Sequence, residues 1–424
     1  MSKQSVLLCG ILTALLLLGC LFSLPFLMFA VVIAISAAIV LLSLREATMI
    51  LFYFSPLSYI LIFKQYNLYF FLIVAYMIAV LLKRKNASGF IALALLMAYC
   101  VVFANHSTLK IGDLIYPLLL MVLMMICQFT ERRDYRILVK CFLVGFLLSA
   151  IVGIFKSQIP MLEAMWELDM LYIEGVETSR NIQRYAGLSY DPNFFALLIC
   201  VLSGSILFSN QKTTLFEKLA IVVLMVMGFF TFSKSYILLL AIILVAYIIE
   251  YSKHPFKILI SIAGVLGCLL LVEYFSSIQI LALIEARFTV AEDANDLTTG
   301  RVDLWKMYIE YIFSDIRCFL VGRGFNAAAL RKAAHNTYID FIYRFGIIGT
   351  ACWVVYFFKC KAVVSALNGN KRSFNMTPLL LGVGVFFLSA FHFQQLWCCL
   401  FFALIAPYLK GEDYEKTECD CTDI

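Results

Sequence analysis

Residues 192–208 read PNFFALLICVLSGSILF, an apolar segment without one charged side chain. A segment of this length can cross the hydrocarbon core of a bilayer as an α-helix. Thirteen similar segments occur along the chain, at residues 5–22, 24–43, 47–63, 67–82, 89–104, 111–129, 137–155, 214–231, 234–250, 256–275, 337–358, 376–392 and 394–409. We therefore expect an all-α polytopic membrane protein with about 12–14 transmembrane helices. The separation between residues 22 and 24 is short, and one long hairpin or a re-entrant pair also fits there.

The composition excludes a water-soluble globule. Hydrophobic residues make up 63% of the chain and charged residues only 14%, too few to cover a water-exposed surface. The formal charge of +6 follows from an excess of cytoplasmic Lys and Arg, and without a basic stripe we expect no nucleic-acid partner. Cys318 is the only cysteine in the two long polar segments, 156–191 and 276–336. A disulfide framework is therefore excluded there. Cys419 and Cys421 lack a nearby His, so a disordered tail is favoured over a metal site or a lipid attachment.

Two gaps between the apolar segments are long, and the charge distribution places both outside the cytoplasm. Lys and Arg concentrate in short loops on the cytoplasmic side, and with an inner N-terminus most of the 33 fall there. The predicted organisation is, in chain order, N-terminal transmembrane helices (1–155), a first extracytoplasmic loop (156–191), central transmembrane helices (192–275), a second extracytoplasmic loop (276–336), C-terminal transmembrane helices (337–410) and a cytoplasmic tail (411–424).

Both long loops also carry helical patterns. In the second loop one face holds Val302, Trp305, Ile309 and Ile312, opposite Asp303, Lys306 and Glu310. This pattern is typical of a helix that lies in the membrane interface. In the first loop Met161, Met165, Leu168 and Tyr172 form a similar stripe. Two interpretations are open: such helices anchor the loops, or they help to hold a lipid-linked ligand.

The first loop ends with a candidate anion site. Asp191 is a good N-cap and Pro192 suits the first position of the following helix. The free backbone N–H groups and the positive dipole end of that helix favour an anion, and Arg184 adds a fork of donors. We therefore expect Arg184, Asp191 and Asn193 at a phosphate site. In the alternative interpretation Asp191 and Asn193 only cap the helix, and Arg184 reaches to lipid headgroups.

The second loop ends in a similar way. Asn336 can cap the next helix, and His335 stands directly before it. A free His titrates at a pH of about 6.5, and a neighbouring helix N-terminus favours the neutral ring that can accept a proton. His335 is therefore a candidate general base, although a purely structural His remains the alternative.

Other outer residues are weaker candidates. Lys64 is an outer lysine in an apolar turn, where it can assist an anion site or simply bind headgroups. Lys234 has the same alternatives, and His106 and His392 also fall at outer helix ends. Cys, His and carboxylates show no metal-ligand spacing, and no phosphate-binding Gly-rich loop occurs. We therefore expect neither a metal nor a cofactor.

The motifs resemble those of the bacterial O-antigen ligases and O-antigen or capsule polymerases. The similarity rests, in chain order, on Arg184, Gly187 and Asp191-Pro192-Asn193, on Gly300-Arg301 with Trp305, on Gly322-Arg323-Gly324, and on His335-Asn336 with Gly346 and Gly349. It covers about the second half of the chain. Ser233-Lys234-Ser235 departs from the family pattern, because many members have Ser-Arg there.

The resemblance implies a metal-independent membrane glycosyltransferase of the bacterial inner membrane, with its site facing the periplasm or exterior. It would move a glycan from undecaprenyl diphosphate to an acceptor glycan hydroxyl. The implied catalytic residues are Arg184, Arg301 and His335, and the substrate-binding candidates are Arg323, Asp191, Asn193, Asn336 and Lys64. The expected partners are the undecaprenyl diphosphate-linked oligosaccharide, the acceptor glycan, membrane lipids and other polysaccharide assembly proteins.

Three functional alternatives remain open from the sequence. A polymerase would transfer to another lipid-linked glycan and is favoured, whereas an O-antigen ligase would transfer to a lipid A core sugar. A lipid-linked oligosaccharide flippase is disfavoured, because coupled transporters usually carry ionisable groups near the bilayer midplane and here these groups stay mostly near segment ends. In a purely structural membrane protein the outer Arg and His would be incidental.

Overall fold

The computed structural model describes residues 3–63, 66–84, 115–162, 170–171, 182–189, 191–209, 213–250, 255–276, 282, 284–285, 300–324, 333–359, 376–388 and 395–409. The α-helices are α1 (Lys3–Leu21), α2 (Pro25–Leu41), α3 (Leu44–Phe54), α4 (Tyr69–Lys83), α6 (Ile115–Phe129), α7 (Tyr135–Ile154), α9 (Pro192–Leu207), α10 (Leu215–Phe229), α11 (Lys234–Glu250), α12 (Pro255–Ser276), α15 (Arg301–Ser314), α16 (Ile316–Val321), α17 (Thr337–Lys359), α19 (Thr377–Phe386) and α20 (Leu396–Leu409). Two antiparallel pairs of two-residue strands join β1 (Ile62–Phe63) to β2 (Tyr66–Asn67) and β3 (Met170–Leu171) to β4 (Ile182–Gln183).

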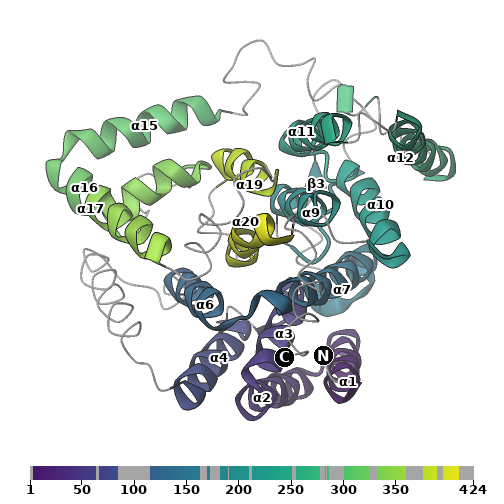
Figure 1. The fold of residues 1–424 in the computed structure, drawn as a ribbon, viewed down its shortest axis with the longest axis horizontal. Helices are drawn as coiled ribbons and strands as arrows, with labels where there is room; N and C mark the ends of the chain where they lie inside the picture. Colours follow the sequence, from purple (N-terminus) through teal and green to yellow (C-terminus); the bar gives the residue numbers. More distant parts are fainter. Residues whose placement is uncertain are drawn as a thin grey trace, which may run out of the picture.

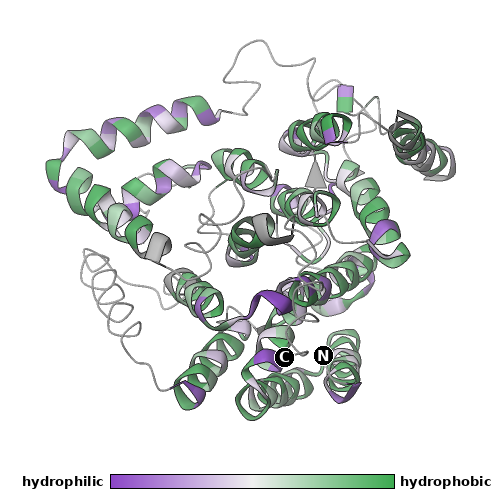
Figure 2. Ribbon diagram, in the orientation of Figure 1, coloured by the Kyte–Doolittle hydropathy of each residue, from purple (hydrophilic) through white to green (hydrophobic). Residues whose placement is uncertain are grey.

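The all-α polytopic membrane architecture expected from the sequence is confirmed. Within the described residues, three helices are long and apolar enough to cross a membrane by length and composition: Lys3–Leu21, Arg132–Ile154 and Thr337–Val355. Seven shorter apolar helices of 10–17 residues accompany them. Large apolar side chains such as Phe26 and Leu41 are more than 80% exposed on the outer faces, which only a lipid environment makes favourable. Figure 2 shows hydrophobic residues along the bundle helices in the centre and on the periphery.

Several predicted boundaries change for physical reasons. The first two segments are separate helices, because α1 ends at Leu21 and α2 begins at Pro25 after a turn with Ser23 at φ 51°. The helix predicted to reach residue 63 ends at Phe54, where Pro56 interrupts the backbone ladder and a 3₁₀ turn follows. The helical stripe expected from Met161 to Tyr172 is wrong at Met170–Leu171, which are a strand paired with Ile182–Gln183. The predicted span at 89–104 lies outside the described residues.

Helix α9 is the centre of the bundle. It packs against α10, α11, α19 and α20, and Figure 1 shows it surrounded by these helices. Nearly every side chain from Phe194 to Ile206 is buried, as expected for a helix that is apolar on all sides. The beginning of α9 is therefore held rigidly at one end of the bundle.

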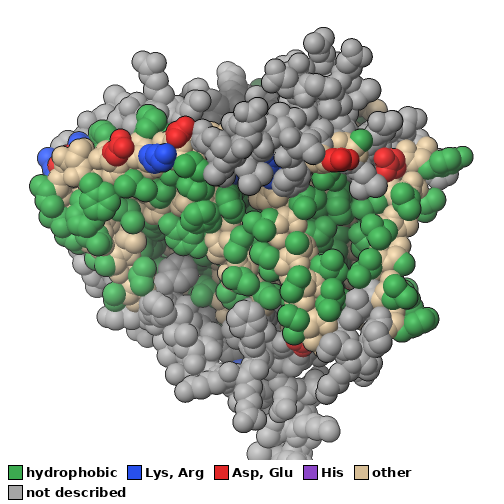
Figure 3. Space-filling model, turned by 90° about the horizontal axis from the view of Figure 1, so that it is seen from above, with side chains coloured by type: hydrophobic (Ala, Val, Ile, Leu, Met, Phe, Trp, Pro, Cys, Tyr) green, Lys and Arg blue, Asp and Glu red, His purple; other side chains and the backbone are tan. Residues whose placement is uncertain are grey.

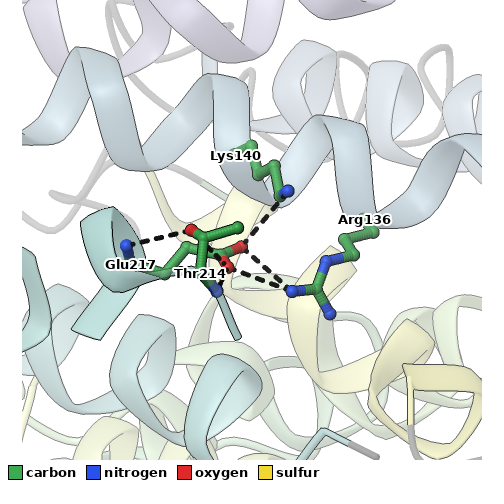
Figure 4. A network of polar contacts seen from close by, with 4 residues as sticks. All are labelled: Arg136, Lys140, Thr214 and Glu217. Atoms are coloured by element: carbon green, nitrogen blue, oxygen red, sulfur yellow. Dashed lines mark hydrogen bonds and ion pairs between the residues drawn. The ribbon is translucent and has the colours of Figure 1, made fainter. Parts of the chain in front are cut away.

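The opposite end of the bundle is rich in basic residues, and we call it the basic end. It contains Arg45 in the first turn of α3, Arg84 after α4, and Arg136 and Lys140 in the first turns of α7. Figure 4 shows Arg136 and Lys140 beside Glu217, whose carboxylate they approach at 3.0 and 3.7 Å. Glu217 also completes a capping box with Thr214 at the start of α10. Since α7 has 20 residues and rises about 1.5 Å per residue, its far end lies about 30 Å away.

Helix α15 crosses the molecule in a different direction from the bundle. In Figure 1 it lies in the plane of the view, whereas α9, α10 and α11 are seen nearly end on. Tyr308 and Ile312 are buried on its inner side, while Asp303 and Lys306 are exposed. Ile309, predicted to share the apolar face, is instead 43% exposed. Figure 3 shows Asp, Glu, Lys and Arg above a broad hydrophobic band, an arrangement that fits a helix in the membrane interface.

Candidate active site

A polar cluster forms where α9 begins, at the end of α7 that is distant from the basic end. Arg184 precedes α9 and is fixed by two hydrogen bonds. Its Nε donates to the carbonyl of Thr231 at 2.8 Å, and one terminal nitrogen donates to Oδ1 of Asn193 at 3.1 Å. The turn after α10 and the first turn of α9 therefore both hold this guanidinium.

Asp191 caps α9 as expected. Its Oδ1 accepts from the backbone N–H of Asn193 at 2.7 Å and from the Asn193 side-chain amide at 2.8 Å. The amide oxygen of Asn193 accepts a further hydrogen bond from Oγ of Ser233 at 2.7 Å. Asn193 is thus a polar junction that joins Arg184, Asp191 and Ser233, and we call these four residues the Asn193 network.

Arg301, the first residue of α15, lies close enough to this network for the charge of Asp191 to act on it. The guanidinium donates to the carbonyl of Phe387, after α19, at 2.7 Å. Burial lowers the pKa of Arg301, and the nearby carboxylate of Asp191 acts in the opposite direction. An arginine keeps its proton in a protein. Arg301 is therefore a partly desolvated cation, and the negative charge of Asp191 stabilises it.

His335 lies next to the Arg301 segment. Trp305, one turn beyond Arg301, donates from its indole nitrogen to the carbonyl of Ala334 at 2.9 Å. Thr337 donates to the carbonyl of Leu388 at 2.6 Å, directly after the acceptor of Arg301. His335 is half-buried between these anchors, and its φ of 48° is uncommon for a residue with a side chain. Such strained positions often occur at functional sites.

Asn336 caps α17 as the sequence predicts. Its Oδ1 accepts from the backbone N–H groups of Tyr338 and Ile339 at 3.0 and 3.2 Å. The side chain is buried at 2% exposure. Because its amide oxygen is occupied by the cap, Asn336 mainly orients the helix start that follows His335.

The remaining predicted residues lie elsewhere. Arg323 forms an ion pair with Asp315, and its guanidinium lies 5.4 Å from the ring centre of Tyr311. These contacts hold it at the α16–α17 packing region, and none of them joins it to Arg184 or Arg301. Lys64 lies outside the described residues, as do His106 and His392.

Two residues that hold the cluster were not among the site candidates predicted from the sequence. Thr231 and Ser233 stand in the turn between α10 and α11 and hold Arg184 and Asn193. Oγ of Ser233 is also 2.8 Å from Oγ of Ser235. The sequence signal that could have indicated them is the hydroxyl-rich string Thr231-Phe232-Ser233-Lys234-Ser235 between two apolar segments. It did not indicate their partners, because Arg184 and Asn193 lie far away in the chain.

Motif glycines permit close contacts beside the cluster and in the α16–α17 packing region. Gly187 has φ 56°, and a Cβ there would lie 2.5 Å from the ring of Phe195. Gly322 has φ 79°, and a Cβ there would lie 2.3 Å from the carbonyl oxygen of Arg344. Gly346 kinks α17 with φ 61° where the backbone of Leu320 approaches. These positions exclude larger residues on both conformational and steric grounds.

Comparison with known proteins finds a similarity for one part of the chain. Residues 219–354 match the O-antigen ligase family model. The matched stretch runs from α10 into α17 and contains Ser233, Arg301 and His335. The match includes the motifs at Gly300-Arg301, Gly322-Arg323-Gly324 and His335-Asn336, whereas Arg184 and Asp191-Pro192-Asn193 lie before it. It is consistent with the family resemblance and with a glycosyltransferase-like enzyme of the O-antigen ligase or polymerase type. No curated protein and no solved structure matches the chain.

Proposed function

We propose that the protein is a polysaccharide polymerase that transfers a glycan from undecaprenyl diphosphate to the hydroxyl of an acceptor glycan. The observation that carries this proposal is the convergence of Arg184 and Arg301 beside the start of α9, with His335 on the adjoining segment. Two cations and a helix N-terminus can bind the negative charge of a diphosphate, and a neutral imidazole can accept the proton of an acceptor hydroxyl. We further propose that catalysis needs no metal or cofactor.

In the proposed reaction the acceptor oxygen attacks the anomeric carbon of the donor sugar. The acceptor proton passes to His335, a new glycosidic bond forms, and the bond to the diphosphate oxygen breaks. Undecaprenyl diphosphate leaves with the bonding electrons and inversion is expected. Arg184 and Arg301 stabilise the charge that develops on the leaving diphosphate. Asp191 and Asn193 orient these groups, and Asn336 positions His335.

We propose that the site faces the periplasm or exterior of the bacterial inner membrane. The basic end, with Arg45, Arg84 and Arg136, would face the cytoplasm because Lys and Arg accumulate there. The candidate site lies beyond the far end of α7, about 30 Å away. The domain organisation proposed from the sequence then places residues 156–191 and 276–336 outside. Labelling of a single Cys at position 301 in intact cells supports this topology, and labelling only after permeabilisation contradicts it.

An O-antigen ligase is the second candidate, because the matching family model carries that description. The two functions differ in the acceptor, which is a lipid-linked glycan for the polymerase and a lipid A core sugar for the ligase. Purified protein offered both acceptors with one lipid-linked donor decides between them. Translocation of the donor without any new glycosidic bond would instead support the flippase alternative.

The experiment that tests the site compares variants in this transfer assay. Arg184→Ala and His335→Ala should abolish or strongly reduce transfer at normal protein levels. Arg317→Ala, an exposed arginine of α16, is the matched control and should retain activity. The wild-type rate should fall at acidic pH, because a protonated imidazole cannot accept the acceptor proton. Full activity of His335→Ala across the pH range would exclude His335 as the base.

A further inference from the structure

A small cavity at the basic end lies far from the candidate active site. It has a volume of about 70 Å³ and lies where α3 and α7 begin and where α4 and α6 end. One ordered water needs roughly 10–15 Å³ of such space. The cavity is therefore large enough for a group of the size of a phosphate.

Among the described residues, one positive charge of the polar lining has no carboxylate partner. Arg45 is neutralised by Asp134, whose Oδ1 lies 2.7 Å from Nε and 2.6 Å from a terminal nitrogen. Arg133 is similarly neutralised by Glu131 at 2.6 Å. Arg84 also lines the cavity and is exposed. Within the described part of the chain its side chain forms no ion pair, and its guanidinium lies 5.6 Å from the ring centre of Phe129. The lining therefore has one net positive charge.

The rest of the lining suits an anion that carries an apolar part. Helices α3 and α7 begin at the cavity with their positive dipole ends, whereas α4 and α6 end there with their negative dipole ends. The helix dipoles therefore largely cancel, and the arginine side chains decide the charge of the site. Leu44, Phe129 and Leu138 supply apolar surface beside the arginines. A phosphodiester carries one negative charge, which balances the single net positive charge of the lining, and the fork of an arginine matches its oxygens.

We propose that this cavity binds the phosphodiester of an anionic phospholipid, with Arg84 as the principal ligand. Basic pockets between helix ends at a membrane surface are typical sites for anionic headgroups. The acyl chains would continue along the apolar outer face of α4, where Leu81 and Leu82 are exposed. This site is separate from the proposed glycan transfer and does not depend on it.

The test measures lipid binding by the purified full-length protein. Thermal unfolding is followed in nanodiscs of phosphatidylcholine alone and with added phosphatidylglycerol, and native mass spectrometry counts retained lipids. Wild-type protein should be stabilised by phosphatidylglycerol and retain it. Arg84→Ala should bind it roughly tenfold to a hundredfold more weakly, as expected when charge-assisted hydrogen bonds are lost. Arg84→Lys should recover part of the binding, because it keeps the charge without the fork.

The controls separate a specific site from general surface charge. Lys218→Ala removes one exposed positive charge from the basic end without touching the cavity, and it should bind like the wild type. An equal loss in Lys218→Ala and Arg84→Ala, or unchanged binding in Arg84→Ala, overturns the proposal. Inorganic phosphate alone should not reproduce the stabilisation, and if it does, the ligand is free phosphate rather than a phospholipid. Because Arg84 is exposed, normal gel filtration of its variants should confirm that they fold.

Discussion

Substitution of Ser233 by Ala tests whether the Asn193 network positions Arg184. Ser233 is buried at 3% exposure, and its hydroxyl donates to Asn193 at 2.7 Å. The change removes this donor and leaves Asn193 held by Arg184 and Asp191 alone. Since the hydroxyl is small, we expect the fold to remain intact.

The expected magnitude follows from the loss of one hydrogen bond. A neutral hydrogen bond contributes about 0.5–1.5 kcal/mol net, which corresponds to a factor of roughly 2 to 13. If Asn193 aligns Arg184 with the leaving diphosphate, this loss appears in the transition state. We therefore expect kcat and kcat/KM to fall together by about threefold to tenfold.

The assay measures the initial rate of glycan transfer over a range of donor concentrations at equal protein levels. Ser235→Ala is the control, because among the described residues Ser235 contacts the network through Ser233, at 2.8 Å, and its effect should be smaller. The decisive comparison adds Ser233→Ala to an Arg184→Ala background. If Ser233 acts through Arg184, the second substitution should cost little further rate. Equal additional losses in both backgrounds would refute the positioning role.

Three further predictions concern the site and its support. Arg301→Lys should retain charge but lose the fork, and we expect a rate about tenfold below wild type in the transfer assay, with loss no greater than in Arg301→Ala. Gly187→Ala should lower the thermal midpoint in detergent, because a strained φ costs about 1–3 kcal/mol before any contact with Phe195 is relieved. Arg344→Ala should strongly reduce the amount of protein in the membrane, because it removes the arginine that pairs with the buried Asp340 at 2.8 Å. Breaking a buried ion pair costs about 3–5 kcal/mol, and normal protein levels would contradict this estimate.

Local properties of the sequence were sufficient to predict the protein class and most helices. Hydropathy depends on consecutive residues, so the apolar segments predicted membrane helices without knowledge of their neighbours. Capping is also local, and Asp191 and Asn336 cap α9 and α17 as expected. The amphipathic pattern after Gly300 similarly predicted α15. Pro56 and Gly346 were also visible in the sequence. It was not predicted that the first would shorten α3 or that the second would kink α17.

The tertiary structure alone decided which distant residues meet. All the apolar segments have similar composition, so the sequence could not indicate that α9 is central. The contacts of Arg184 with Thr231 and of Arg301 with Phe387 join residues far apart in the chain. Arg323 shows the same limit, because its motif suggested substrate binding whereas folding pairs it with Asp315. A side chain's chemistry is encoded at its own position, but its partner depends on how the helices pack.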